Sequence, residues 1–247
     1  MESTTVLESG VSLRIQPFGD SALMLDVLAE DRLVRQEATV RVRSSILLEV
    51  PFGVLDVVAG FESLLVEFDA DRVEHEGVDQ AVRLAVSLGF ARSADATASG
   101  RVLEVPTLFG GEFGPDLEEV AAELDLTAAE VVDRFVDRPL TISLLGAAMA
   151  PMMHGVDLPA DVSRTALPRT RVEGGSVMLA GSNAIISPFP GPTGWRVIGR
   201  TPLTICDIEH DPVVSYAPGD VLRFRAIERV EFESLAGAFL SSATALS

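Results

Sequence analysis

The first 92 residues alternate short apolar runs with turn residues, and this pattern predicts an α+β domain. Four runs have the alternation and β-branched composition of strands, and two longer segments have helical spacing. The predicted strands are 12–15, 22–27, 54–58 and 64–68, and the predicted helices are about 30–48 and 78–88, the second ending at Gly89. This order favours an antiparallel sheet with both helices on one face.

Beyond residue 100 the apolar runs are short and separated by Gly and Pro, which predicts a small β-barrel. Two short helices interrupt the strands. Asp116 and Thr127, each followed by Glu three residues later, are expected to cap these helices. The predicted strands are 102–105, 140–145, 177–180, 195–198, 203–205 and 221–227.

A small and polar segment, SADATASG, separates the two patterns and is typical of a linker. We therefore expect an N-terminal α+β domain in residues 1–92, a linker at 93–100 and a mainly-β barrel domain with a helical insertion in residues 101–233. The uncharged tail at 234–247 is expected to fray, unless Leu235, Phe239 and Leu240 dock as one helical face.

The charge of the chain limits the classes of partner. The formal net charge is −18, so long-range repulsion disfavours nucleic acid and an anionic membrane surface. A small anion can still bind where arginines gather. The sequence has no lysine, which excludes a Schiff-base lysine, a P-loop lysine and biotin attached to this chain.

Cysteine content and apolar runs indicate a cytoplasmic protein. Cys206 is the single cysteine and cannot form an internal disulfide, and the polar start MESTTVLESG has no signal-peptide pattern. Gly, Pro, Ser or Asn interrupts the long uncharged runs, so no membrane span is expected. The mean hydropathy of +0.32 is high for an acidic protein and hints at a subunit interface.

Candidate chemistry centres on residues 168–203, which have almost no acidic side chains but four arginines. Arg169, Arg171 and Arg200 lie beside turns at predicted strand ends, where a guanidinium can bind a carboxylate or phosphate. Surface ion pairs explain these arginines about equally well. No metal site is expected, because the three histidines lack ligand spacing, and Cys206 is interpreted as a buried thiol.

Several motifs resemble those of one family. They resemble the family of the 5-oxoprolinase B subunit, which is also called allophanate hydrolase subunit 1 or the KipI-like family. The similar runs occur in the family's order and extend over nearly the whole of this chain. The matching runs are GDSALML (19–25), GGEFGPDLEEVA (110–121), LPRTRVEGGSV (167–177), LAG (179–181), GWRVIGRTPL (194–203) and PGDVLRF (218–224).

The resemblance implies an α+β domain followed by a cyclophilin-like barrel. It also implies a hydrolase subunit that acts with a partner of the C-subunit type, also called allophanate hydrolase subunit 2. The implied reaction is the ATP-dependent opening of 5-oxoproline to glutamate. Because this sequence has no P-loop and no lysine, we expect ATP to be bound largely by or with the partner, or at a different kind of site. In this interpretation Arg169, Arg171 and Arg200 hold a substrate carboxylate or carboxyphosphate-like group. Asn183 and Thr201 orient that group by hydrogen bonds.

Two segments depart from the family pattern and keep alternatives open. Residues 146–153 lack the aromatic residues of the family's GF-x-PGF-x-Y-L stretch, and residues 180–188 lack its QTG core. A second interpretation is therefore a non-catalytic KipI-like regulator that binds a partner such as a sensor histidine kinase. A third is a carboxyltransferase component of a urea-carboxylase-like system, which needs a biotin-bearing partner.

Overall fold

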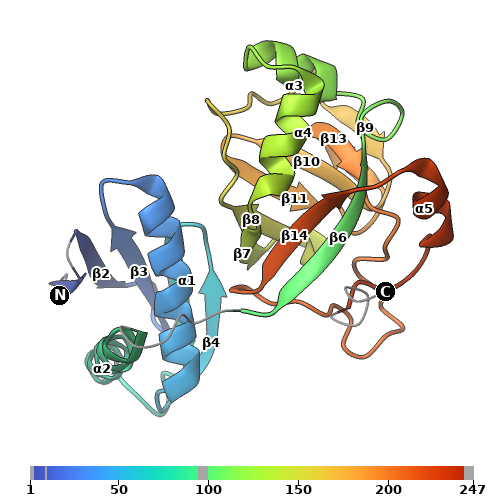
Figure 1. Cartoon of the computed structure of the whole chain (residues 1–247). Helices are drawn as coiled ribbons and strands as arrows, with labels where there is room; N and C mark the ends of the chain where they lie inside the picture. Colours follow the sequence, from blue (N-terminus) through green and yellow to red (C-terminus); the bar gives the residue numbers. More distant parts are fainter. Residues whose placement is uncertain (1–2, 9, 94–99, 242–247) are drawn as a thin grey trace. The chain divides into compact units, whose positions relative to one another are not determined.

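The computed structural model describes residues 3–8, 10–93 and 100–241 (Figure 1). The chain divides into two compact units, residues 1–99 and 100–247. Positions 94–99 of the expected linker and 242–247 of the expected tail lie outside the described residues. None of the described helices is both long and apolar enough to cross a membrane.

The first unit is built on an antiparallel five-stranded sheet in the order β1-β2-β3-β5-β4. Alternate side chains of its strands point into one core, such as Leu13 and Ile15 of one strand and Leu23 and Leu25 of the next. The strands are β1 (Ser3–Glu8), β2 (Val11–Pro17), β3 (Ala22–Leu28), β4 (Val54–Ala59) and β5 (Ser63–Phe68). The four predicted strands are confirmed, and β1 is an addition.

Two helices, α1 (Arg32–Glu49) and α2 (His75–Ser93), supply the other half of this core (Figure 1). The prediction that the second helix ends at Gly89 is wrong, because the helix continues to Ser93. Gly89 instead marks the point where the two helices meet. An added Cβ there would overlap the Ser45 side chain of α1, so the glycine permits close helix packing.

The second unit is a closed seven-stranded barrel, as the strand pattern predicts, in the order β10-β11-β8-β7-β14-β6-β13. Its strands are β6 (Val102–Phe109), β7 (Leu140–Leu145), β8 (Pro151–His154), β10 (Ser176–Ala180), β11 (Asn183–Ile186), β13 (Arg196–Arg200) and β14 (Val221–Ala226). All neighbours pair antiparallel except β6 and β14, which are parallel. Leu222 and Phe224 of β14 point into the barrel core, as their alternation with arginines predicts.

The helical pair between β6 and β7 consists of α3 (Leu117–Glu123) and α4 (Ala128–Asp137), whose apolar residues join the barrel core. Thr127 caps α4 with the predicted reciprocal capping box to Glu130. Asp116 precedes α3, but its side chain makes no capping hydrogen bond. That predicted cap is wrong, because the Asp116 carboxylate is committed to a different contact.

Asp116 joins the helical pair to a two-stranded ribbon, β9 (Arg169–Val172) and β12 (Gly191–Thr193). Its carboxylate is 2% exposed, pairs with the Arg169 guanidinium, and accepts a hydrogen bond from the Val197 backbone N–H at 2.8 Å. Val172 of the ribbon packs on Met178 and Val197, with Trp195 beside them. The ribbon therefore rests on the outer face of the barrel.

The segment after residue 200 has less regular structure than expected. Residues 203–205 form no strand, and Thr204 makes an isolated bridge to Phe239. α5 (Arg229–Ser234) follows β14, and a 3-10 turn, η1 (Ala147–Met149), joins β7 to β8. Leu240 is fully buried in the barrel core and is held by backbone pairing with Thr204, not by a helical face.

We expect Asp116→Ala to lower the free energy of unfolding by about 2–4 kcal/mol, because it removes a buried carboxylate and leaves Arg169 and the Val197 N–H without their partner. Urea unfolding followed by the fluorescence of Trp195, the single tryptophan, measures the loss. Glu119→Ala is the control, because Glu119 pairs with Arg196 at an exposed position and should cost less than about 1 kcal/mol. Equal losses in the two variants would contradict the assigned role of Asp116.

Candidate functional site

Arg200 of the second unit lies between two aromatic side chains. It ends β13 and pairs across the sheet with Ser176 of β10. Its guanidinium carbon lies 4.9 Å from the centre of the Phe113 ring and 5.1 Å from that of Phe232. The two rings are themselves 4.8 Å apart. We call Arg200, Phe113 and Phe232, together with Arg229, the arginine cluster.

The glycine-rich loop after β6 places Phe113 in this cluster. Gly110 and Gly111 both have positive φ, at 72° and 53°, which turns the chain sharply back toward β13. The Gly110 N–H donates to the Ile198 carbonyl at 3.1 Å, and Gly114 lies so close to the same carbonyl that a Cβ would overlap it. The loop is thus fixed two residues before Arg200, and the glycine pair is explained by this turn.

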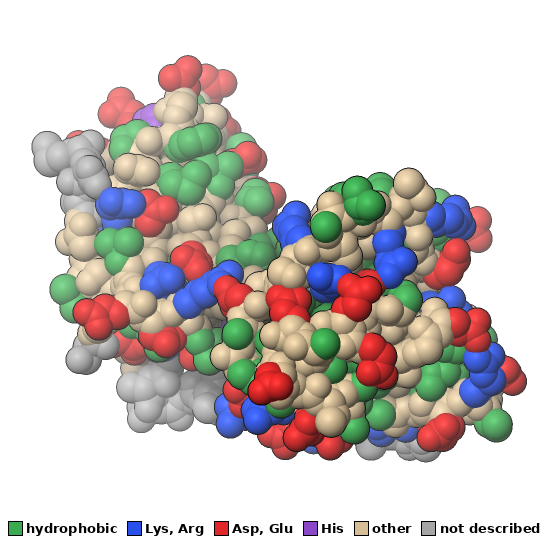
Figure 2. All heavy atoms as spheres, turned by 90° about the horizontal axis from the view of Figure 1, so that it is seen from above, with side chains coloured by type: hydrophobic (Ala, Val, Ile, Leu, Met, Phe, Trp, Pro, Cys, Tyr) green, Lys and Arg blue, Asp and Glu red, His purple; other side chains and the backbone are tan. Residues whose placement is uncertain are grey.

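Among the residues that the structure describes, no carboxylate forms an ion pair with Arg200. Its guanidinium instead makes cation–π contacts with the rings of Phe113 and Phe232. The rings attract the cation through their faces, which leaves the edge of the planar guanidinium able to donate hydrogen bonds. On the face shown in Figure 2, by contrast, arginine and carboxylate side chains lie next to one another. An incoming carboxylate could therefore bind Arg200 without displacing an internal partner.

The other two candidate arginines are already paired. Arg169 donates from Nε to Asp116 at 3.3 Å, and this hydrogen bonding raises the pKa of Arg169 above its usual value. Arg171 pairs with Glu173 at 3.3 Å, and both side chains are more than half exposed. A ligand would have to compete with these carboxylates.

Thr201 lies next to Arg200, whereas Asn183 does not. Thr201 is 2% exposed, and its Oγ1 accepts from the Leu203 N–H at 3.3 Å while its own N–H donates to the Gly175 carbonyl. Asn183 is also buried but pairs with Ala180, at the opposite end of β10 from the residue that faces Arg200. The structure therefore groups only part of the predicted site.

A buried Ser143–His154 pair is a feature that the sequence did not indicate. The two side chains extend from neighbouring strands β7 and β8, each 2% exposed, and His154 Nδ1 lies 2.6 Å from Ser143 Oγ. Burial lowers the pKa of His154 from 6.5 to about 4, so the ring is neutral at physiological pH. Across the described ranges, no cluster of three or more His, Cys, Asp or Glu could hold a metal ion.

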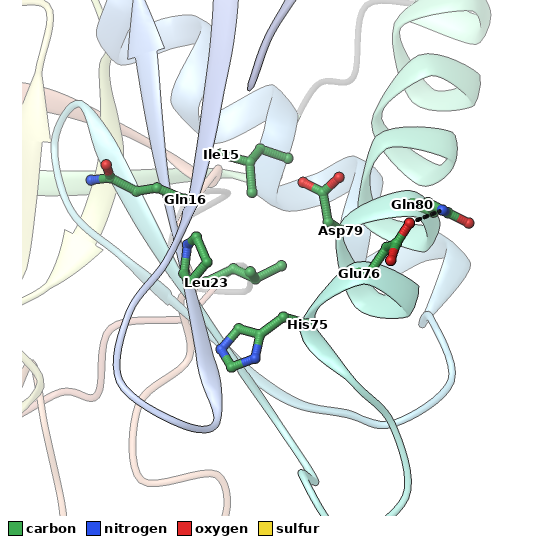
Figure 3. A pocket seen from close by; sticks show the side chains of 8 residues that line it. Ile15, Gln16, Leu23, His75, Glu76, Asp79 and Gln80 are labelled. Carbon is green, nitrogen blue, oxygen red and sulfur yellow. Dashed lines mark hydrogen bonds between the residues drawn. The ribbon is translucent and has the colours of Figure 1, made fainter. Parts of the chain in front are cut away.

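A cavity of about 320 Å³ in the first unit lies between the β2–β3 strands and α2 (Figure 3). Ile15 and Leu23 form its apolar wall, and Glu76 and Asp79 extend from α2. Asp79 is held by Arg83 at 2.9 Å, and Glu76 accepts from Gln80 at 3.4 Å. Because these acids have internal partners, the cavity is a weaker candidate site than the arginine cluster.

Comparison with known proteins places these features in a family context. A family model described as carboxyltransferase domain, subdomain C and D, matches residues 13–215. The B subunit of 5-oxoprolinase from Bacillus subtilis (strain 168) is 31% identical over 233 residues, which cover 91% of this chain and 97% of that protein. The corresponding protein of Escherichia coli O157:H7 is 28% identical over 207 residues, covering 83% of this chain and 92% of that one.

Solved structures share the fold. The conserved uncharacterized protein PH0987 from Pyrococcus horikoshii has a TM-score of 0.52 and 28% identity, and the match covers 88% of this chain and 99% of PH0987. The K. lactis urea amidolyase has a TM-score of 0.69 and 16% identity, and the match covers 96% of this chain but 16% of that larger protein. The second likeness concerns the fold alone.

The buried histidine predicts acid sensitivity. His154 is neutral in the folded protein down to about pH 4 but takes up a proton in the unfolded chain below pH 6.5, so stability should be unaffected above pH 6.5 and fall as the pH decreases below it. Its contribution to the loss between pH 7.5 and 5 is about 2 kcal/mol. In the variant His154→Gln, the free energy of unfolding measured in urea should not show this loss between pH 7.5 and 5. His210→Gln, at an exposed position, should retain it, and an unchanged pH profile in His154→Gln would contradict the assignment.

Proposed function

The chain belongs to the family of the 5-oxoprolinase B subunit, as its sequence motifs predict, and on this basis we propose that it is part of an ATP-dependent amidohydrolase that opens 5-oxoproline to glutamate. Its relatives are named as one subunit of 5-oxoprolinase, which supports a protein that works in a multi-subunit assembly. We assign the partner to the C-subunit type, the allophanate hydrolase subunit 2 of the family resemblance.

Arg200 carries the proposal for the substrate site. 5-Oxoproline is an anion at neutral pH, and Arg200 is the candidate arginine whose charge lacks an internal carboxylate within the described part of the chain. The aromatic rings restrict the guanidinium, which reduces the entropy lost when a carboxylate binds. Thr201 supplies a buried backbone contact that fixes the end of β13 beneath Arg200.

Arg169, Arg171 and Asn183 take secondary roles in this proposal. The two arginines would have to leave Asp116 and Glu173 to bind substrate, and the Asp116 pair is buried and costly to break. Asn183 lies at the other end of β10, so it would orient a group distant from the carboxylate at Arg200.

ATP is assigned to the partner or to a site shared with it. The triphosphate of ATP needs concentrated positive charge, and this chain has a net charge of −18 and no lysine. The chain's own contribution is then to bind and orient the lactam. Positioning of a reactant can supply a large share of catalysis without a reacting group on this protein.

A non-catalytic regulatory protein is the second candidate. The connection from β7 to β8 favours it, because Ala147 of the turn and Pro151, the first residue of β8, stand where the family resemblance leads us to expect aromatic residues. Ala148 and Met149 of this turn have positive φ, a backbone conformation that L residues seldom adopt. A regulatory protein of this kind would form a stable complex with its partner but support no 5-oxoproline turnover.

The test is 5-oxoproline-dependent ATP hydrolysis by the chain co-expressed and co-purified with a partner of the C-subunit type. Arg200→Gln should raise KM for 5-oxoproline roughly 10- to 100-fold, the loss expected for a charge-assisted hydrogen bond. Arg164→Gln is the matched control, because Arg164 also lies over an aromatic ring, Trp195, at 5.8 Å.

The outcomes separate the two candidates. Turnover in the wild-type complex that is impaired by Arg200→Gln and unchanged by Arg164→Gln supports the substrate site. Turnover unaffected by Arg200→Gln rejects that site but not the activity. A stable complex without any turnover favours the regulatory protein.

A further inference from the structure

The Phe113 ring lies close to a second arginine. The guanidinium carbon of Arg229, the first residue of α5, is 5.1 Å from the ring centre, almost the same distance as that of Arg200. Arg229 and Arg200 are far apart in sequence but share this one aromatic residue. Two guanidinium groups thus lie within about 5 Å of the centre of one ring, and the carboxylates that act on Arg229 are those of Glu112 and Glu233.

Glu112 partly neutralises this charge. It precedes Phe113 in the glycine-rich loop and forms an ion pair with Arg229. That hydrogen bond is the main reason that the pKa of Arg229 is raised. The Arg229 and Glu112 side chains are 59% and 68% exposed, so solvent screens the pair and its contribution to stability is small.

We propose that Arg200 and Arg229 together form a carboxylate-binding site around Phe113, and that Glu112 occupies half of this site in the unliganded protein as an internal competitor. The inference rests on the proposed function, whose substrate and product are both carboxylates. It adds Arg229 as a second binding residue and assigns Glu112 a role opposed to binding.

The energies favour an exchange of partners. Giving up an exposed ion pair costs at most a factor of about five in affinity, because such pairs are weak in water. A ligand carboxylate that reaches both guanidinium groups gains charge-assisted hydrogen bonds to two donors, each worth a factor of roughly ten or more. Glu112 is attached to the loop beside Phe113, so its competition is always present but can be removed by a single substitution.

The consequence is an unusual direction of effect for an acidic residue in a binding site. Removing Glu112 should tighten the binding of a small carboxylate, whereas removing either arginine should weaken it. The gain should also require Arg229, because Glu112 acts on the ligand through that side chain. This dependence separates a specific competitor from a general reduction of negative charge.

The experiment is calorimetric titration of the full chain with 5-oxoproline. Glu112→Gln should lower Kd about 2- to 5-fold, Arg229→Gln should raise it about 2-fold or more, and Arg200→Gln should raise it roughly 10- to 100-fold. The double variant Glu112→Gln/Arg229→Gln should have the Kd of Arg229→Gln alone. Glu119→Gln is the matched control, because Glu119 is also 68% exposed in an ion pair with arginine, and its Kd should equal that of the wild type.

The results separate the two levels of the proposal. If Arg200→Gln weakens binding but Glu112→Gln does not tighten it, the competitor role of Glu112 is wrong and the Arg200 site stands. If Glu119→Gln tightens binding as much as Glu112→Gln, the effect is one of net charge and the inference is also wrong. If no variant changes Kd, or the wild type does not bind, both the inference and the proposed carboxylate site are rejected.

Discussion

The buried carboxylate of Asp116 imposes the central constraint on the second unit. A charge that is 2% exposed must be paired and hydrogen-bonded, and Asp116 meets this demand with Arg169 and the Val197 N–H. The Asp116 N–H in turn donates to the Val197 carbonyl at 2.9 Å. One residue thus fixes the ribbon, the start of α3 and the first half of β13. Because Val197 lies three residues before Arg200 on this strand, the same contact also fixes the strand that carries Arg200.

Sequence periodicity predicted the elements that have one face in a core and the other in solvent. The strands β2, β3 and β5 are of this kind. The helix α4 was predicted from its Thr127 capping box instead. The short strands β8, β9, β11 and β12 gave no such signal. All five residues of β10 are buried, so this strand, although correctly predicted, shows no alternation of apolar and polar residues. Gly89 was misinterpreted because a local pattern contains no information about Ser45 on the facing helix.

The candidate site was predictable only as a concentration of arginines. Local composition indicated Arg200, but its aromatic neighbours come from the β6–α3 loop and from α5, distant in sequence on either side. The partner of Arg169 is also 53 residues away, which is why an arginine in a segment poor in acids is nonetheless paired. Asn183 and Arg200 lie in the same arginine-containing segment of the sequence but beside opposite ends of β10. Asn183 pairs with Ala180, the last residue of β10, and Arg200 pairs with Ser176, its first residue. The Ser143–His154 pair includes the residue at which the register of β7 shifts, between Ile142 and Leu144, and no sequence pattern marks this irregularity.

The parallel pairing of β6 with β14 has a consequence for the order of folding. These are the first and the last strands of the barrel in the sequence. The hydrogen bond between Arg101 and Asp220, which directly precede them, joins residues 119 positions apart. During synthesis the barrel cannot close until β14 has left the ribosome, whereas every strand and helix of the first unit is already complete by residue 93. The loop entropy of this long-range pairing makes barrel closure the slow step. We therefore expect a nascent chain with a folded first unit and an open sheet with two exposed edges, at which chaperones would act.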